Sequence, residues 1–238
     1  RMEQERLGRA ASVTQENVLS YWDMDAKLGR GWRERFDESL GTAQRVGIEP
    51  FAEADIVAAL KDRDWQILPL VEDIRVIKSP AEVALTRRIA GYWTHAMNAM
   101  LSEIQVGKSV PELMQIGSQV MDDILANEPG ADHFNSRAHM LFSCSPESSC
   151  PHHFSLKAND IVKNGATVIN ALGAVSWYTA ENERTILTGN YTAQHTELFD
   201  IAQQGQQLAL DLIKPGVPCA EVDSAVQDFF IKQGVAEH

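Results

Sequence analysis

The side chains best suited to chemistry in this sequence gather in one stretch of its second half. A histidine pair, His152 and His153, comes first, and Asn170, Glu181 and Glu183 follow within about 30 residues. Imidazole exchanges a proton near neutral pH, and carboxylates can either hold a metal ion or act as acid and base. The residue types therefore allow two kinds of site, a metal centre or an acid–base centre.

A β-hairpin is expected to carry the three polar residues. Two runs of strand-forming residues, Thr167–Ile169 and Thr185–Leu187, flank a connection that contains Gly, Ser and Trp, a pattern typical of two paired strands. Asn170, Glu181 and Glu183 lie on or beside these strands. The hairpin would therefore bring them together on a sheet.

Helices are predicted on both sides of this hairpin. Ser79 followed by Pro80 and Glu82 combines a capping box with the preferred position of proline, so a long helix should run to about Ile104. A second helix should begin at Ser109. Residues 128–164 are rich in Pro, Ser, Asn and Asp and are predicted to be a long loop, which in a compact domain is often functional. The helix that begins at Ser109 should end at about Asn127. Two further helices are expected, over about Ala193–Ile213 and about Cys219–Gln233.

The N-terminal part reads as an incomplete α/β unit. We expect a strand over Asn17–Trp22, a short helix over Phe51–Leu60 and an extended segment over Trp65–Val71. These elements are too few to build a sheet with a core of its own. The predicted domains are thus residues 1–76 and 77–238.

Composition excludes several classes of function. The formal net charge of −12 disfavours nucleic acid and anionic membranes as partners, because both require basic patches. No apolar run approaches the roughly 18 residues of a membrane span. The odd number of cysteines, Cys144, Cys150 and Cys219, argues against a disulfide framework and favours a cytoplasmic protein with reduced thiols.

One internal similarity has two explanations. Each of two blocks consists of a long helix, a glycine break and a shorter helix, and the break glycines, Gly107 and Gly216, are 109 residues apart. Chance similarity between two helical units is one explanation. The other is a domain made of two related halves, the second of which lacks its strands.

Three ordered motifs resemble the creatinase/aminopeptidase P/prolidase family. They are the run RVIKSPAE from Arg75 to Glu82, the Pro151-His152-His153 pattern, and the break IKPG from Ile213 to Gly216 followed by Glu221-Val222. The order and spacing agree across residues 70–235. The resemblance implies an α/β (α+β) fold: a truncated pita-bread catalytic domain of the M24 type, preceded by part of a creatinase-like N-terminal α/β domain.

The metal-binding positions of that family are altered in this chain. The resemblance places the two aspartates that bind the metal pair at Asn170 and Glu181. An amide offers only a neutral oxygen, whereas a bridged metal pair needs anionic ligands. We therefore expect no cofactor, with a divalent metal (Mn, Co or Zn) as the alternative if Glu181 serves as a ligand.

The segment Glu183-Arg184-Thr185 is similar to that of creatinases, which use no metal. The resemblance implies that His152 shuttles a proton and that Glu183 orients the cationic group of the substrate. It also implies that His153, Tyr178 and Glu181 contact the substrate. Because Glu181 departs from the creatinase pattern as well, neither subgroup fits cleanly.

The leading hypothesis is a hydrolase that cleaves a C–N bond in a small amidino or amide compound or in an Xaa-Pro-like peptide. One alternative is a divalent-metal-dependent Xaa-Pro aminopeptidase or dipeptidase, and another is a non-catalytic pita-bread module that binds peptides or proteins. The resemblance also implies a homodimer. It further implies that the chain is an inactive fragment, since the family completes its site with a later histidine and two glutamates.

Overall fold

The computed structural model describes residues 18–21, 28–60, 62–128, 130–150 and 157–235. The chain divides into two compact units, residues 1–78 and 79–238. The division falls between Lys78 and Ser79, two residues beyond the expected domain boundary. His152 and His153 lie outside the described residues.

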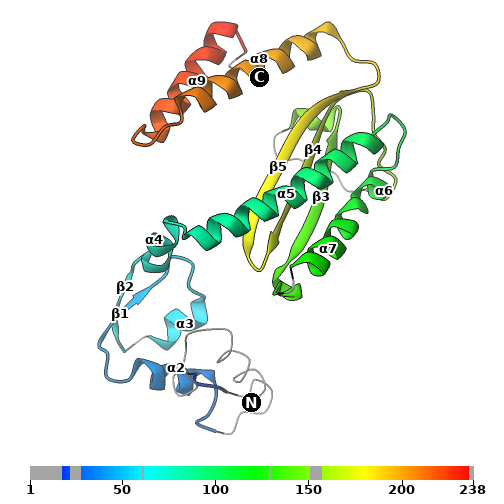
Figure 1. Ribbon diagram of the computed structural model, residues 1–238. Helices are drawn as coiled ribbons and strands as arrows, with labels where there is room; N and C mark the ends of the chain where they lie inside the picture. The colour runs from blue at the N-terminus through cyan, green and yellow to red at the C-terminus, as the bar shows by residue number, and fades with distance from the viewer. Residues whose placement is uncertain (1–17, 22–27, 61, 129, 151–156, 236–238) are drawn as a thin grey trace. The chain divides into compact units, whose positions relative to one another are not determined.

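The first unit is built around two short parallel strands (Figure 1). Helix α2 (Trp32–Leu40) precedes strand β1 (Arg45–Ile48), helix α3 (Ala54–Ala59), strand β2 (Asp64–Ile67) and helix α4 (Leu70–Val76). Strands β1 and β2 pair in parallel, with Arg45 opposite Asp64. The helix expected over residues 51–60 is confirmed as α3.

Two expectations for this unit fail in the described residues. The extended segment predicted over Trp65–Val71 ends at Ile67, because Pro69 and the apolar residues after it begin helix α4. The strand predicted over Asn17–Trp22 has both ends outside the described residues, and residues 18–21 between them form no strand.

The second unit places a three-stranded antiparallel sheet against helices (Figure 1). The strands are β3 (Arg137–Cys144), β4 (Gly165–Val175) and β5 (Tyr178–Thr188), in the order β3-β4-β5. The helices are α5 (Pro80–Glu103), α6 (Val110–Met114), α7 (Ile116–Asn127), α8 (Ala193–Leu212) and α9 (Cys219–Gln233), with short 3₁₀ turns η2 (His133–Asn135) and η3 (Glu147–Ser149).

The capping box predicted at the start of α5 is confirmed. The Ser79 hydroxyl accepts a hydrogen bond from the Glu82 N–H at 3.3 Å, and the Glu82 carboxylate accepts one from the Ser79 N–H at 2.7 Å. The two long helices α8 and α9 also match their predicted spans. No helix in the described part of the chain is long and apolar enough to cross a membrane.

The predicted loop over residues 128–164 is wrong, since it contains strand β3. Met140, Leu141 and Phe142 are consecutive apolar residues, so this strand has no alternation of apolar and polar residues to mark it. The neighbouring Ser and Pro residues further suggested a loop. The omission matters because β3 is one of the three strands of the sheet.

The core lies between α5 and one face of this sheet. Ile89, Trp93 and Met97 of α5 are buried against Ile169 of β4 and Phe142 of β3. Burying a side chain of this size stabilises the fold by about 1.5–3 kcal/mol. This packing holds the hairpin β4–β5 on a rigid support.

A two-residue turn fixes the register of the hairpin. Ser176 and Trp177 both have positive φ, at 48° and 71°, as a type I′ turn requires. The turn is held from outside, because the Ser176 hydroxyl accepts the Asp132 N–H and the Trp177 N–H donates to the Asn135 carbonyl. The resulting register sets Asn170 opposite Glu183.

Candidate functional site

The two faces of the sheet carry different kinds of side chain. Directly opposed residues in antiparallel strands point to the same face, and residues two apart along a strand do so as well. Ile169, Ala171 and Phe142 therefore share the face covered by α5. Asn170, Glu181 and Glu183 share the opposite face, which we call the acidic face.

Asn170 bridges the two glutamates of β5. Its side-chain Nδ2 donates to Glu181 Oε1 at 2.5 Å and to Glu183 Oε2 at 2.8 Å. The hairpin therefore brings together the three polar residues that the sequence singled out. Both glutamates are exposed, whereas the Asn170 side chain is only 2% exposed.

This hydrogen bonding fixes the orientation of the Asn170 amide. The amide NH₂ has two donors, one for each carboxylate, while turning Oδ1 toward the acids would place three acceptors together. Oδ1 consequently faces away from the glutamates, and it is buried without a hydrogen-bond partner. An unpaired buried acceptor costs about 1–3 kcal/mol, so this atom is suited to a donor from a bound molecule.

The described residues do not fit a pair of divalent metals. They contain no group of three or more His, Cys, Asp or Glu side chains that could hold one ion. At the centre of the acidic face, moreover, a neutral amide presents N–H donors to both carboxylates, whereas a cation needs oxygen ligands there. The arrangement can instead hold an organic cation, whose attraction to each carboxylate is about 1–4 kcal/mol at 4 Å.

Strand β3 extends the acidic face beyond the predicted residues. His139 lies opposite Leu172, Leu141 opposite Asn170 and Ser143 opposite Val168. These three side chains of β3 therefore belong to the acidic face. Neither His139 nor Ser143 was among the site residues predicted from the sequence. No local signal pointed to them, because their spacing of two residues places His139, Leu141 and Ser143 on one face only once β3 is known to be a strand.

The segment before the histidine pair is anchored to the sheet. Lys163 forms an ion pair with Glu147 at 3.2 Å, and the Ser148 hydroxyl donates to the Ala166 carbonyl at 2.8 Å. These contacts tie η3 to the beginning of β4. The described segment that ends at Cys150 is therefore held at this end of the sheet.

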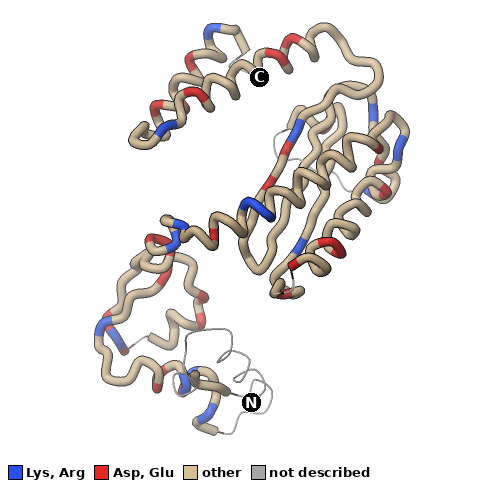
Figure 2. The backbone as a smooth tube through the Cα atoms, viewed as in Figure 1, with Lys and Arg blue, Asp and Glu red and all other residues tan. Residues whose placement is uncertain are grey.

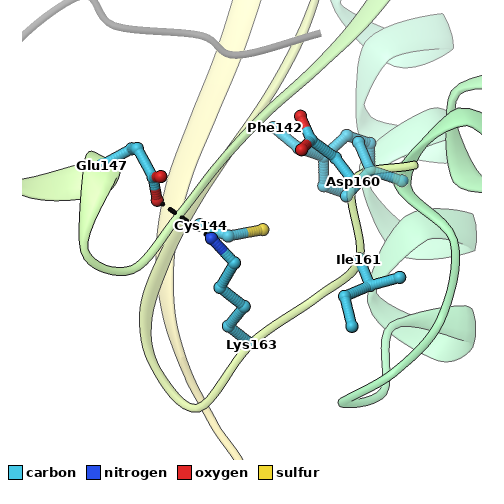
Figure 3. Close-up of a pocket in the computed structure, with 7 residues that line it drawn as sticks. Phe142, Cys144, Glu147, Asp160, Ile161 and Lys163 are labelled. Carbon is cyan, nitrogen blue, oxygen red and sulfur yellow. Dashed lines mark hydrogen bonds and ion pairs between the residues drawn. The ribbon is translucent and has the colours of Figure 1, made fainter. Parts of the chain in front are cut away.

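A small pocket beside this anchor is too confined for a substrate. Figure 3 shows the Lys163–Glu147 pair next to Cys144, with Phe142, Asp160 and Ile161 also lining the pocket. Its volume is about 20 Å³, which is enough for a single water molecule. Burial raises the pKa of the Cys144 thiol, so this cysteine is a poor nucleophile at neutral pH.

Tyr178 lies on the helix-covered face, away from the acidic face. Its hydroxyl donates to Glu82 Oε1 at 2.8 Å, and its ring packs on the core. This placement ties the start of β5 to the start of α5, and it does not favour the predicted contact between Tyr178 and substrate. Arg184 donates to the backbone carbonyl of Glu183 at 2.6 Å, a contact that supports the strand.

A larger cavity lies between β5 and α8. It has a volume of about 430 Å³ and is lined by Glu183 and Leu187 on one side and by His195 and Phe199 on the other. His195 Nδ1 accepts the Thr192 N–H at 3.1 Å, which leaves Nε2 to carry the proton of a neutral ring. The cavity is thus lined by an imidazole from α8 and a carboxylate from β5.

The overall negative charge is spread over the chain. Acidic residues occur along the helices and strands of both units and do not gather in one region (Figure 2). The net charge of −12 consequently does not locate a site. The acidic face is distinguished by the contacts among its residues.

Two Xaa-Pro dipeptidases are similar to this chain in sequence. The chain is 25% identical over 214 residues to the Xaa-Pro dipeptidase of Pyrococcus furiosus, which covers 86% of the chain and 59% of that protein. It is 23% identical over 211 residues to the Xaa-Pro dipeptidase of Pyrococcus horikoshii, with 86% and 58% covered. The chain thus spans slightly less than three fifths of the length of these relatives.

Solved structures show the same fold. Prolidase from Pyrococcus furiosus matches with a TM-score of 0.79 at 20% identity, over 99% of this chain and 65% of that chain. X-Pro aminopeptidase from Thermotoga maritima MSB8 matches with a TM-score of 0.66 at 19% identity, over 89% and 60%. The predicted pita-bread architecture is therefore confirmed.

The model of one family matches most of the second unit. Residues 84–238 match the model of "Metallopeptidase family M24". That range includes the whole sheet and the acidic face, and it covers more than half of the chain. The resemblance drawn from the sequence motifs is confirmed, and the chain belongs to metallopeptidase family M24.

Proposed function

We propose that this chain contributes to a hydrolase that cleaves a C–N bond next to a cationic group, and that the acidic face holds this group without a metal pair. Family M24 peptidases are hydrolases, which supports the reaction class. The observation that carries the proposal is the Asn170 amide between Glu181 and Glu183, at 2.5 and 2.8 Å.

Glu183 is proposed to orient the cationic group of the substrate. It lies directly opposite Asn170 and at the edge of the 430 Å³ cavity, and its carboxylate is exposed. A bound amidinium or ammonium group can replace water on this carboxylate while the amide of Asn170 keeps it in position. Glu181, one row further along the sheet, adds a second negative charge.

His152 remains our proposed proton shuttle, and His153 a proposed substrate contact. Both residues lie outside the described part of the chain, so their support is the sequence pattern Pro151-His152-His153 and the anchored segment that precedes it. An imidazole can take a proton from water and return it to the leaving nitrogen near neutral pH. Such a shuttle performs hydrolysis when a neighbouring carboxylate holds the substrate.

The second candidate is a divalent-metal-dependent Xaa-Pro peptidase. The names of the two Pyrococcus relatives favour it, as does the metallopeptidase family itself. The residues at the acidic face disfavour it, because Asn170 would have to turn its amide and Glu181 would have to replace an aspartate. The two candidates therefore differ in the role of Asn170.

Assays of the full-length protein that contains this chain separate these functions, with creatine or the dipeptide Gly-Pro as the substrate and each with and without a chelator. We expect hydrolysis that survives the chelator and falls at least 100-fold in Glu183→Gln. Glu197→Gln removes an equal charge from an exposed position on α8 and should leave the rate unchanged. Loss of activity in chelator that Mn²⁺ restores would establish the metallopeptidase instead. Absence of hydrolysis with retained binding of either compound would favour the non-catalytic module.

A further inference from the structure

The face of the sheet that carries the glutamates also carries two basic side chains. Arg137 and His139 of β3 are both exposed to solvent. They pair with Ala174 and Leu172 of β4, and residues two apart on a strand share a face. Both side chains therefore belong to the acidic face, on the strand farthest from the glutamates. We call these two residues the basic edge.

The basic edge and the glutamates lie on opposite sides of a single strand. Leu172 of β4 pairs with His139 on one side and with Glu181 on the other. Because neighbouring strands are about 4.7–4.9 Å apart, the backbones of His139 and Glu181 are separated by about 9.5 Å. Arg137 lies one row further toward the hairpin turn, opposite Ala174. The surface between the two charged sides is thus aliphatic and one strand wide.

The Arg137 guanidinium is suited to a carboxylate ligand. None of the ion pairs found among the described residues involves Arg137. A guanidinium is planar and can bind a carboxylate through two parallel hydrogen bonds. The imidazole of His139, two residues further along β3, can donate another. Glu181 and Glu183 cannot bind such a group, because ionised carboxylates only accept hydrogen bonds.

We infer that Arg137 and His139 are specificity-determining residues, which bind a carboxylate group of the substrate at the basic edge. This inference rests on the proposed function, in which the glutamates hold the cationic group. The substrate then lies across β4, with its two charged ends on opposite sides of that strand. Its direction is fixed as well, because the reverse orientation would set its carboxylate beside Glu181 and Glu183, and like charges repel.

The competing explanation of the basic edge is structural. Strand β3 is an outer strand of the three-stranded sheet, and charged side chains on such a strand can prevent it from pairing with another chain. This role needs a charge but no particular ligand. The two explanations differ in what a substitution changes. Loss of a ligand contact alters the choice between substrates, whereas loss of edge protection alters self-association alone.

Substrates with and without a carboxylate test the inference on the full-length protein that contains this chain. Creatine is compared with creatine amide, and Gly-Pro with Gly-Pro amide, so that each pair differs in one charge. For the carboxylate of the pair that is hydrolysed, Arg137→Gln should lower kcat/KM about tenfold, mainly by raising KM, because a charged hydrogen bond is lost. The matching amide should stay within about twofold of wild type. His139→Gln should show the same pattern with a smaller loss.

Controls separate the possible failures. Arg87→Gln removes an exposed arginine of α5 and should leave the rates for both compounds unchanged. Arg137→Lys keeps the charge and should recover part of the lost preference for the carboxylate. If Arg137→Gln changes the carboxylate and the amide equally, or changes neither, the inference is overturned in favour of edge protection. If wild type hydrolyses neither pair, or if Glu183→Gln hydrolyses them as fast as wild type does, the proposed function itself fails and the inference falls with it.

Discussion

Replacing the bridging amide by a carboxylate should destabilise the protein at neutral pH. Asn170→Asp removes the two hydrogen bonds that the Asn170 amide donates to Glu181 and Glu183, at 2.5 and 2.8 Å. It also adds a third negative charge beside two others. The substitution changes the side chain by one atom, so its effect reports the electrostatics of the acidic face rather than its packing.

The expected cost follows from these contacts. Two unit charges at 4 Å repel by about 1 kcal/mol in water and about 4 kcal/mol near a protein surface. Because the glutamates are exposed, we take the lower part of this range for both pairs and add the lost hydrogen bonds, which gives about 3 kcal/mol. For a chain of this size that cost lowers the melting temperature by roughly 6–12 °C.

Thermal unfolding at several pH values, followed by circular dichroism, measures this effect. The repulsion is present above the ordinary carboxyl pKa of about 4 and disappears below it, so the two proteins should melt alike near pH 3. Added Mn²⁺ should raise the melting temperature of Asn170→Asp more than that of wild type. Asn159→Asp makes the same charge change at an exposed turn and serves as the control. Equal stability of Asn170→Asp and wild type at pH 7 would refute the reasoning.

Four further substitutions test the framework around the site. Glu128→Gln should lower stability slightly at neutral pH, because Arg88, at 2.9 Å, holds the pKa of the Glu128 carboxyl below its usual range. The difference from wild type should begin to shrink below the ordinary carboxyl pKa of about 4 and disappear as the pH falls through the lower pKa of the folded state, which urea unfolding can measure. Gly173→Ala should cost about 3 kcal/mol, since the added Cβ would lie 2.0 Å from the backbone carbonyl oxygen of Arg137 and 2.7 Å from the indole ring of Trp93. Gly91→Ala, on α5 with open space around it, should instead stabilise the protein by about 0.5–1 kcal/mol. Equal effects of the two substitutions would contradict the packing described. Tyr178→Phe should lower the free energy of unfolding by about 1 kcal/mol, because it removes the 2.8 Å hydrogen bond to Glu82. The substitution should leave cation binding unchanged. Weaker binding would indicate that Tyr178 contacts the bound cation.

Local signals in the sequence were sufficient for the hairpin and for the long helices α5, α8 and α9. The capping box at Ser79 and Glu82, the glycine breaks and the β-branched runs all act over a few residues, so they can be recognised without knowing the fold. Strand β3 carries no such local signal, because Met140, Leu141 and Phe142 are consecutive apolar residues. Its place is determined by packing against α6 and α7 and by pairing with β4.

The candidate site was predicted in part for the same reason. Spacing along the hairpin identified Asn170, Glu181 and Glu183, and their contacts depend only on the register of two neighbouring strands. Ser143 joins them through a third strand that the sequence did not reveal. Tyr178 is near them in sequence but faces α5, since adjacent residues of a strand alternate between faces.

The manganese content of the wild-type protein tests the central claim most directly. The protein would be dialysed against MnCl₂, freed of unbound metal and measured by elemental analysis. Because Asn170 presents its N–H donors to Glu181 and Glu183, we predict less than one Mn per chain. Two tightly held Mn ions per chain would contradict the account, since both carboxylates would then have to serve as metal ligands.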